Sequence, residues 1–271
     1  MKVYFIGAGP GAADLITIRG AEILSRAQLV MYAGSLVSEA MLRHCRANPL
    51  VVNTAKLHLD EQLEYYRQAK EKDWDVARLH SGDPSIYGAT AEQMRRLDEL
   101  QIAFEVVPGV PSFVSAAAVL NAELTKPNVS QTIILTRTAG RASPMPVKES
   151  LSSLAAHQAT LCIFLSGANL SVVIEELLVH YPQNTPVALV QRATWPEEQV
   201  HRGQLGELLN EIEPRSWALT TMLIVGQTLD KTIGSDSRLY AVDYSHRFRR
   251  AADFAPSPPL ATSAKVQKDP Q

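Results

Sequence analysis

Short apolar segments alternate with helical patterns from the first residues of the chain, and this alternation limits the fold more than any other feature. Helical spacing of apolar residues is clearest at 17–27, 60–72 and 89–100. Alternation of this kind predicts a mainly parallel sheet with helices on both faces. The strands expected in this half of the chain are 3–6, 29–32, 50–53, 76–80 and 104–107.

A break near 124–130, marked by Pro127 and Asn128, separates this half from a second patterned half. There, strands are expected at 132–136, 160–165, 186–191, 198–203 and 222–226, with helices at 147–157 and 170–180. We therefore predict an α/β protein with two α/β domains, mainly parallel or mixed sheets, and a cleft between the domains. Clefts of that kind are favoured ligand sites. The predicted domains are 1–124 and 130–230, followed by an extension at 231–271 that is largely disordered from about 251.

Charge and cysteine content exclude several classes of protein. The formal net charge of −2 argues against a general nucleic-acid binder, so no nucleic-acid partner is expected. Cys45 and Cys162 lie far apart without metal-ligand spacing, and Cys162 falls within an apolar strand, so we expect a buried inert thiol there and no metal site. The sequence shows neither a signal-type start nor an apolar run of membrane-spanning length, which predicts a cytoplasmic protein without a membrane partner.

Residues 81–88, Ser-Gly-Asp-Pro-Ser-Ile-Tyr-Gly, carry the strongest chemical signal. They follow the strand expected at 76–80, and open α/β sheets bind their ligands at the carboxyl ends of strands. Asp83 is expected to cap the following helix, with Pro84 at the first helical position, where no amide donor is missed. An ordinary strand-to-helix turn is the alternative interpretation.

A glycine loop at 7–11, Gly-Ala-Gly-Pro-Gly, follows the first expected strand and invites comparison with a dinucleotide fingerprint. Pro10 removes a backbone donor from the stretch that would cradle a pyrophosphate. The helical pattern resumes only near Thr17, and no acidic residue follows the second strand at 29–34 to bind a ribose. These departures argue against a nicotinamide site.

Several motifs together resemble those of the tetrapyrrole methylases, which are S-adenosylmethionine-dependent enzymes of sirohaem and corrin synthesis. The segments that carry the resemblance are 7–17, 82–88, 108–112, 164–167, 192–196 and 223–226, in the family's order over about residues 1–230. Segments 32–36, 135–141 and 193–197 most resemble the branch that methylates carbon 11 of precorrin-4. The resemblance implies S-adenosylmethionine as methyl donor, S-adenosylhomocysteine as product, a small-molecule tetrapyrrole substrate and a homodimer.

The resemblance also implies a set of cofactor-binding residues on the loops of both halves. They are Pro10, Ser81, Gly82, Asp83, Ile86, Pro111, Ser112, Ser166, Gly167, Arg192 and Ala193. The family's sirohaem-making members usually have Met at the position of Ser166 and Gly at that of Ala193. A purely capping role is the alternative for Asp83, Ser112 and Ser166.

Methyl transfer is an in-line displacement, so positioning matters more than a strong acid or base. The methylated carbon is already nucleophilic, and we assign no catalytic base. His80 is expected to be a strand residue with a satisfied ring. The acetate and propionate groups of a precorrin call for scattered cations, for which Arg137, Arg141, Lys148 and also Arg192 are candidates; each could equally be a solvated surface charge. Trp195 could flank the macrocycle or form a packing corner.

Three other functions remain open. The first is the same reaction on the cobalt-containing substrate, because that metal would sit in the substrate and need no protein ligand. The second is a related precorrin-2 or precorrin-3 methylase. The third, from a different class, is a non-catalytic tetrapyrrole-binding module, against which the intact motifs in both halves argue.

Overall fold

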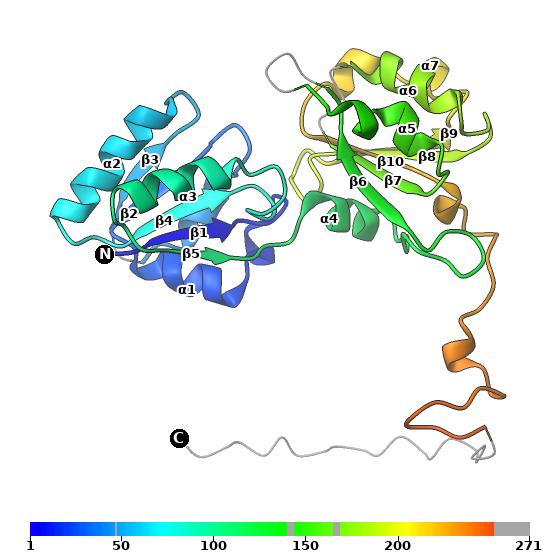
Figure 1. Ribbon diagram of the computed structural model, residues 1–271, viewed down its shortest axis with the longest axis horizontal. Coiled ribbons are helices and arrows are strands. Elements are labelled where there is room, and N and C mark those ends of the chain that lie inside the picture. The colour runs from blue at the N-terminus through cyan, green and yellow to red at the C-terminus, as the bar shows by residue number, and fades with distance from the viewer. Residues whose placement is uncertain (47, 140–143, 165–168, 252–271) are drawn as a thin grey trace.

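The computed structural model describes residues 1–46, 48–139, 144–164 and 169–251, and these form two lobes and a C-terminal segment (Figure 1). The first lobe contains a five-stranded sheet of order β3-β2-β4-β1-β5, in which every pair is parallel. Its strands are β1 (Val3–Gly7), β2 (Leu29–Tyr32), β3 (Leu50–Asn53), β4 (Val76–His80) and β5 (Phe104–Val107). The parallel sheet expected from the alternation is thus confirmed.

Helices cover both faces of this sheet, so its central strands are buried throughout. They are η1 (Ala13–Leu15), α1 (Ile18–Arg26), η2 (Glu39–His44), α2 (Leu59–Glu71) and α3 (Thr90–Glu99). Tyr4 and Ile6 of β1 pack in the cluster that contains residues of α1 and η2, whereas Val3 and Phe5 pack in the cluster that contains residues of α2 and α3. A strand covered on both faces needs continuous apolar sequence, which is why β1 shows no polar alternation.

The second lobe contains a mixed sheet of order β6-β7-β10-β8-β9. Only β6 and β7 run parallel; the other three pairs are antiparallel. Its strands are β6 (Ile133–Arg137), β7 (Thr160–Phe164), β8 (Pro186–Gln191), β9 (Gln199–Gln204) and β10 (Thr221–Val225). Apart from α4, described below, the helical elements of this lobe are η3 (Val147–Glu149), α5 (Leu151–Ala155), α6 (Leu170–Leu178), α7 (Leu208–Glu211), η5 (Pro214–Trp217) and η6 (Gln227–Leu229).

Helix α4 (Ser112–Val119) connects the two lobes. It follows β5 in sequence, yet Ala116 and Ala117 pack against the second sheet in a cluster that includes Cys162 and Ile224. The opposite face of that sheet packs against α5, α6 and α7. Cys162 is fully buried, and burial raises the pKa of its thiol to about 12, as expected for an inert core residue.

The single helix expected at 147–157 is wrong. Two short pieces, η3 and α5, are separated at Ser150, whose ψ of 147° is extended. The Ser150 hydroxyl accepts a hydrogen bond from the Ser153 amide at 3.2 Å, which makes Ser150 the cap of a new helix rather than an interior residue. Sequence periodicity does not show this interruption.

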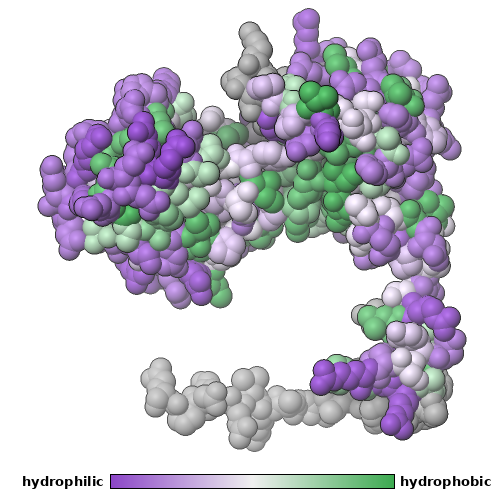
Figure 2. Space-filling view, viewed as in Figure 1, coloured by the Kyte–Doolittle hydropathy of each residue, from purple (hydrophilic) through white to green (hydrophobic). Residues whose placement is uncertain are grey.

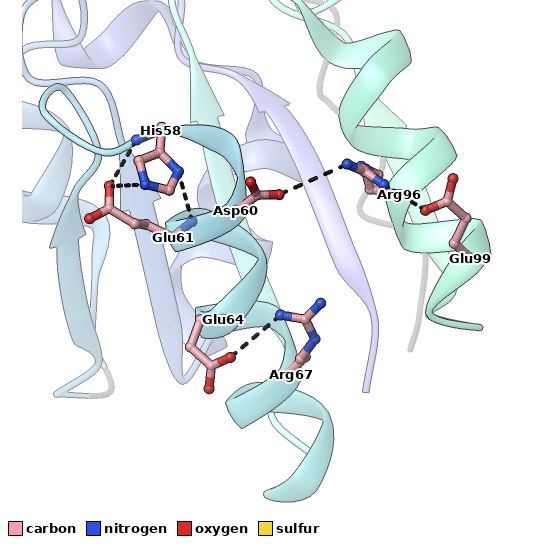
Figure 3. A network of polar contacts seen from close by, with 7 residues as sticks. All are labelled: His58, Asp60, Glu61, Glu64, Arg67, Arg96 and Glu99. Atoms are coloured by element: carbon pink, nitrogen blue, oxygen red, sulfur yellow. Dashed lines mark hydrogen bonds and ion pairs between the residues drawn. The ribbon is translucent and has the colours of Figure 1, made fainter.

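Ion pairs on α2 and α3 lie on the outer surface of the first lobe (Figure 3). Arg96 lies 3.1 Å from Glu99 and 3.9 Å from Asp60, which links the two helices. His58 and Glu61 form a capping box at the start of α2. Exposed ion pairs of this kind contribute at most about 1 kcal/mol each, so the core rather than these charges stabilises the lobe.

A buried cation lies beneath the same two helices. Arg78, in the middle of β4, is 6% exposed, and its guanidinium donates to Thr54 at 2.8 Å, Gln62 at 3.1 Å and Gln93 at 3.3 Å. These partners are neutral, and no carboxylate pairs with Arg78 among the described residues. Burial lowers the pKa of Arg78.

Replacing Arg78 with Met is expected to lower the free energy of unfolding by about 2 kcal/mol, because the buried Thr54 hydroxyl loses its donor and the Gln93 oxygen keeps only the Tyr66 hydroxyl, at 3.5 Å. Urea denaturation measures the change. Arg95→Met, on the exposed surface of α3, is the matched control and should change stability by less than about 0.5 kcal/mol. Equal stability of Arg78→Met and wild type would contradict a requirement for the buried hydrogen bonds.

The described chain after η6 leaves the second lobe as a segment that reaches away from both lobes (Figure 1). Asn128 donates to Ser235 at 2.8 Å, and the Lys126 ammonium donates to the Asp230 carbonyl, so the start of this segment is attached to the lobe. It includes η7 (Arg238–Tyr240). Among the described helices, none has both the length and the apolar character needed to cross a membrane.

Candidate functional site

Three loops meet backbone to backbone where β1, β4 and β5 end. A Cβ atom added at Gly7 would lie 2.5 Å from the Cα of Gly109, and one added at Gly109 would lie 2.7 Å from the Cα of Gly7. The Gly82 carbonyl oxygen lies between them, 2.7 Å from the Cβ position of Gly7. Real Cβ atoms do not come this close to backbone, so glycine is required at Gly7 and Gly109.

The glycine loop and the Ser81–Gly88 loop are also paired by hydrogen bonds. Gly82 donates to the Gly9 carbonyl at 2.8 Å and Gly9 donates to the Gly82 carbonyl at 3.2 Å, forming an antiparallel bridge. The φ angles are +76° at Gly9 and +63° at Gly82, a region that favours glycine. The glycines therefore bring three loops together instead of opening a helix, in agreement with the argument against a nicotinamide site.

Asp83 does not cap a helix, so that expectation is wrong. Helix α3 begins only at Thr90, with Ala89 as its cap. The Asp83 carboxylate accepts from the Ser85 amide at 2.8 Å, from the Ser85 hydroxyl, and from the Gly109 amide at 2.9 Å. Partial burial opposes ionisation, yet the hydrogen bonds from Ser85 and Gly109 hold the pKa of Asp83 below its usual value. Asp83 thus joins its own loop to the next one.

The Pro108–Ser112 loop leads directly into α4. Pro111 is the residue before the helix and Ser112 is its first residue. No side chain caps the amino end of α4 in the described part of the chain. The Val114 amide donates to the Pro111 carbonyl at 3.1 Å, which leaves the amides of Ser112 and Phe113 without a capping partner among the described residues. Such an end attracts a carboxylate or another anion.

The loop after β8 brings the second lobe onto the glycine loop. The Thr194 hydroxyl accepts from the Ala12 amide at 3.0 Å, and the Trp195 indole donates to the Pro10 carbonyl at 2.8 Å. The Trp195 ring covers Gly11, where an added Cβ would lie 2.9 Å from Cγ of the indole. Of the two roles considered for Trp195, the structure shows the packing corner, and Pro10 is its partner in the first lobe.

Replacing Trp195 with Phe is expected to lower the free energy of unfolding by about 1 kcal/mol, because the ring remains over Gly11 while the hydrogen bond to Pro10 is lost. Thermal and urea denaturation check this value. Trp74→Phe serves as control for the smaller ring alone, because Trp74 packs partly buried against the first-lobe core and its indole N–H has no hydrogen-bond partner among the described residues; it should change stability by less than about 0.5 kcal/mol. A Trp195→Phe variant that matches wild type would show that the indole N–H contributes nothing.

The other residues expected in the cofactor site fall into three groups. Ser81 is exposed and Ile86 half-buried on the first-lobe loop. Ala193 is buried in the cluster that contains α4, on the second sheet. Ser166 and Gly167 lie outside the described residues.

Arg192 has its side chain on a different part of the second lobe. Its guanidinium lies 3.7 Å from the Glu197 carboxylate and lines a hollow of about 330 Å³ together with Arg215 and Leu219. A second hollow, of about 390 Å³, shares Arg215 and reaches the start of α6. Neither hollow is lined by the first-lobe loops.

The candidate substrate residues are spread along the second lobe. Arg137 ends β6 and donates to the carbonyls of Thr138 at 3.0 Å and Pro144 at 3.3 Å. Lys148 is exposed in η3. Arg141 lies outside the described residues.

His80, at the end of β4, is 7% exposed. Burial, and then the charge of Arg78, lowers its pKa to about 3, so the ring is neutral at neutral pH. The expectation of a fully satisfied ring is wrong, because Nε2 has no hydrogen-bond partner among the described residues. The Nε2 atom is also out of reach of solvent.

Aromatic residues at the meeting of the lobes were not among the residues expected in the site. Tyr87 of the Ser81–Gly88 loop lies edge-to-face on Phe164, which ends β7, with ring centroids 5.0 Å apart. Phe113 of α4 lies 6.5 Å from Phe164. The only sequence signal for them is that each adjoins a residue or segment proposed for the cofactor.

Comparison with known proteins agrees with this architecture. The family model for the Tetrapyrrole (Corrin/Porphyrin) Methylases matches residues 2–209. A precorrin-4 C(11)-methyltransferase from Pseudomonas aeruginosa is 48% identical over 249 residues, covering 92% of this chain and 99% of the relative.

Solved structures show the same two-lobed fold. A cobalt precorrin-4 methyltransferase of cobalamin biosynthesis superposes with a TM-score of 0.81 at 40% identity, covering 84% of this chain and 96% of the other. A uroporphyrin-III C-methyltransferase from Thermus thermophilus, complexed with S-adenosylhomocysteine, gives a TM-score of 0.72 at 25% identity, with 84% and 99% coverage. From its motifs, its two joined lobes and these matches, the chain belongs to the tetrapyrrole (corrin/porphyrin) methylase family.

Proposed function

We propose that this chain transfers the methyl group of S-adenosylmethionine to carbon 11 of precorrin-4, in the synthesis of corrins. The observation that carries the proposal is the 48% identity to a precorrin-4 C(11)-methyltransferase over 92% of this chain and 99% of that enzyme. The convergence of the three glycine-containing loops supplies a physical site for it.

The described residues fit such a cofactor. Gly82 and Asp83 place backbone groups at the loop junction, and the uncapped start of α4 at Ser112 suits the carboxylate of the methionine moiety. Pro10, Ser81, Ile86, Pro111 and Ala193 would complete the site, together with Ser166, Gly167 and the backbone of Arg192. When bound, the sulfonium supplies the methyl group, and its positive charge disappears as the methyl leaves.

The chain's own contribution is therefore positioning. The Asp83 carboxylate holds two of the loops together, and Thr194 and Trp195 hold the second lobe against the first. His80 stays neutral and buried, so it neither donates nor removes a proton at neutral pH. Holding two reactants in line can lower a barrier by several kcal/mol without acid or base chemistry.

The same reaction on a cobalt-containing precorrin-4 is the second candidate function. It is favoured by the superposition on a cobalt precorrin-4 methyltransferase at a TM-score of 0.81 and 40% identity. We place precorrin-4 first because the identity to the precorrin-4 enzyme is higher.

One experiment separates these candidates. The purified chain is incubated with methyl-labelled S-adenosylmethionine and either a metal-free or a cobalt-containing precorrin-4 generating system, and the product is located by mass spectrometry and NMR. We expect label at carbon 11 and faster transfer to the metal-free substrate. Label on another carbon, or no transfer despite tight binding of S-adenosylhomocysteine, would overturn the proposal.

We further propose that the chain works as a homodimer, as the family resemblance implies. Analytical ultracentrifugation at micromolar concentration should give about twice the monomer mass of 29.7 kDa. The cytoplasmic location stays a prediction from the sequence.

A further inference from the structure

Tyr87 combines an exposed ring with a strained backbone. Its φ of +53° is uncommon for a large side chain, and the residue is 49% exposed. Its neighbour Gly88 cannot carry a Cβ atom, because the Pro84 backbone lies in the way, so the loop turns sharply at this point. Strained backbone conformations cluster at active sites and ligand clamps, which makes Tyr87 a position to test for such a role.

The ring of Tyr87 points at the second lobe rather than into its own core. It meets Phe164 at 64° with centroids 5.0 Å apart, and Phe164 meets Phe113 at 65° and 6.5 Å. The three rings come from the β4–α3 loop, the end of β7 and the start of α4. They form an aromatic cluster where the two lobes meet, defined here as Tyr87, Phe113 and Phe164.

Each ring of the aromatic cluster directly adjoins part of the proposed cofactor site. Tyr87 follows Ile86, Phe113 follows Ser112, and Phe164 precedes 165–168. A methyl acceptor must lie within a few ångströms of the sulfonium for transfer. Side chains next to the cofactor loops are therefore the first that the acceptor can reach.

A cation and a carboxylate both lie beside this cluster, and the cation is the one that adjoins Phe164. Arg137 is the strand partner of Phe164 in β6 and β7. Its charge acts on the Tyr87 hydroxyl, and so does that of Glu149 from η3. Apolar surface also covers α4 and β6, where Val114 and Leu135 are 44% and 37% exposed (Figure 2). Exposed aromatic and aliphatic side chains beside a cation match a macrocycle that is apolar on its face and carries carboxylates around its edge.

We propose that Tyr87, with Phe113 and Phe164, receives the face of the tetrapyrrole, and that Arg137 binds one of its carboxylates. This inference rests on the proposed function and adds the residues that hold the acceptor. It makes Tyr87 a substrate-binding residue, whereas the cofactor is bound by the loop residues named under the proposed function.

The test replaces Tyr87 with Asn, which tolerates the left-handed backbone while removing the ring. We expect an unchanged or higher Tm and a dissociation constant for S-adenosylhomocysteine within twofold of wild type. The KM for enzymatically generated precorrin-4 should rise at least tenfold. Tyr87→Phe keeps the ring and should stay within threefold of wild type. Ala89→Asn relieves the same kind of strain on the same loop, with φ of +48°, and should leave KM unchanged.

Other outcomes overturn the inference in distinguishable ways. A fall in Tm with unchanged KM would make the ring structural. Weaker binding of S-adenosylhomocysteine with unchanged KM would assign the aromatic cluster to the cofactor. Failure of the wild-type chain to transfer methyl at all would instead overturn the proposed function, and it is measured before any variant is compared.

Discussion

Gly109→Ala is expected to abolish binding of S-adenosylhomocysteine and to lower the free energy of unfolding by about 3 kcal/mol, near the upper end for overpacking. The added methyl group would lie 2.7 Å from the Cα of Gly7 and closer still to the Gly82 carbonyl oxygen. Backbone on both sides cannot rotate away as a side chain can. The three loops must therefore separate, which breaks the hydrogen bond between Asp83 and the Gly109 amide.

Gly203→Ala is the matched control for this prediction. There the added methyl would meet the tip of the Glu211 side chain, which is 43% exposed and can move aside once its contact with His201, at 2.9 Å, is given up. We expect wild-type binding of S-adenosylhomocysteine and a change in stability below about 1 kcal/mol, in the range of ordinary surface substitutions. Isothermal titration calorimetry measures the binding of S-adenosylhomocysteine by both variants, and urea denaturation measures their free energies of unfolding. Tight cofactor binding by Gly109→Ala would refute the backbone-contact argument.

Asp83→Ala is expected to weaken binding of S-adenosylhomocysteine by roughly 30-fold, which corresponds to about 2 kcal/mol for the loss of charge-assisted hydrogen bonds. The amides of Ser85 and Gly109 lose their acceptor, and the loop that follows β4 is no longer joined to the loop that follows β5. Calorimetry measures the affinity. Asp98→Ala, on the exposed side of α3, should bind like wild type.

The contribution of Asp83 to the free energy of unfolding also has a defined pH dependence. Its pKa in the folded chain is lowered from the ordinary 3.8, so its contribution to stability is present above pH 3.8 and is lost as the pH falls through the lower folded value. The stability difference between wild type and Asp83→Ala should thus be constant from pH 5 to 8 and shrink below about pH 4. A difference that titrates near neutral pH would point to another group.

Much of the first lobe could be predicted from sequence because its buried parallel strands are apolar along their whole length. The second lobe was harder to predict for a physical reason. The neighbours of β10 are decided by pairing between segments that are distant in sequence. The sequence of a strand such as β8 does not show whether its neighbour β10 runs parallel or antiparallel to it. The pattern therefore predicted strands correctly while leaving open whether the sheet was parallel or mixed.

In the candidate site, too, the local sequence showed where the loops are but not which distant residues they contact. Glycine and proline marked the loops, but the role of Asp83 in joining two loops was missed because one of its donors, Gly109, lies 26 residues away. The contact of Trp195 with Pro10 spans 185 residues. The packing of Tyr87 on Phe164 joins residues 77 positions apart, and the sequence around Tyr87 gives no sign of it. Local patterns find loops, whereas the partners of a loop are found only in three dimensions.

The strand orders have a consequence for how the chain is made. β1 is synthesised first but lies between β4 and β5, and β10 is synthesised last of all the strands but lies between β7 and β8. At translation rates of about 5–20 residues per second, the apolar β1 waits roughly 4–15 s for β4 to leave the ribosome. The second sheet is incomplete until β10, which lies between β7 and β8, has been synthesised. Nascent chains of this protein should therefore be clients of ribosome-associated chaperones over most of their synthesis.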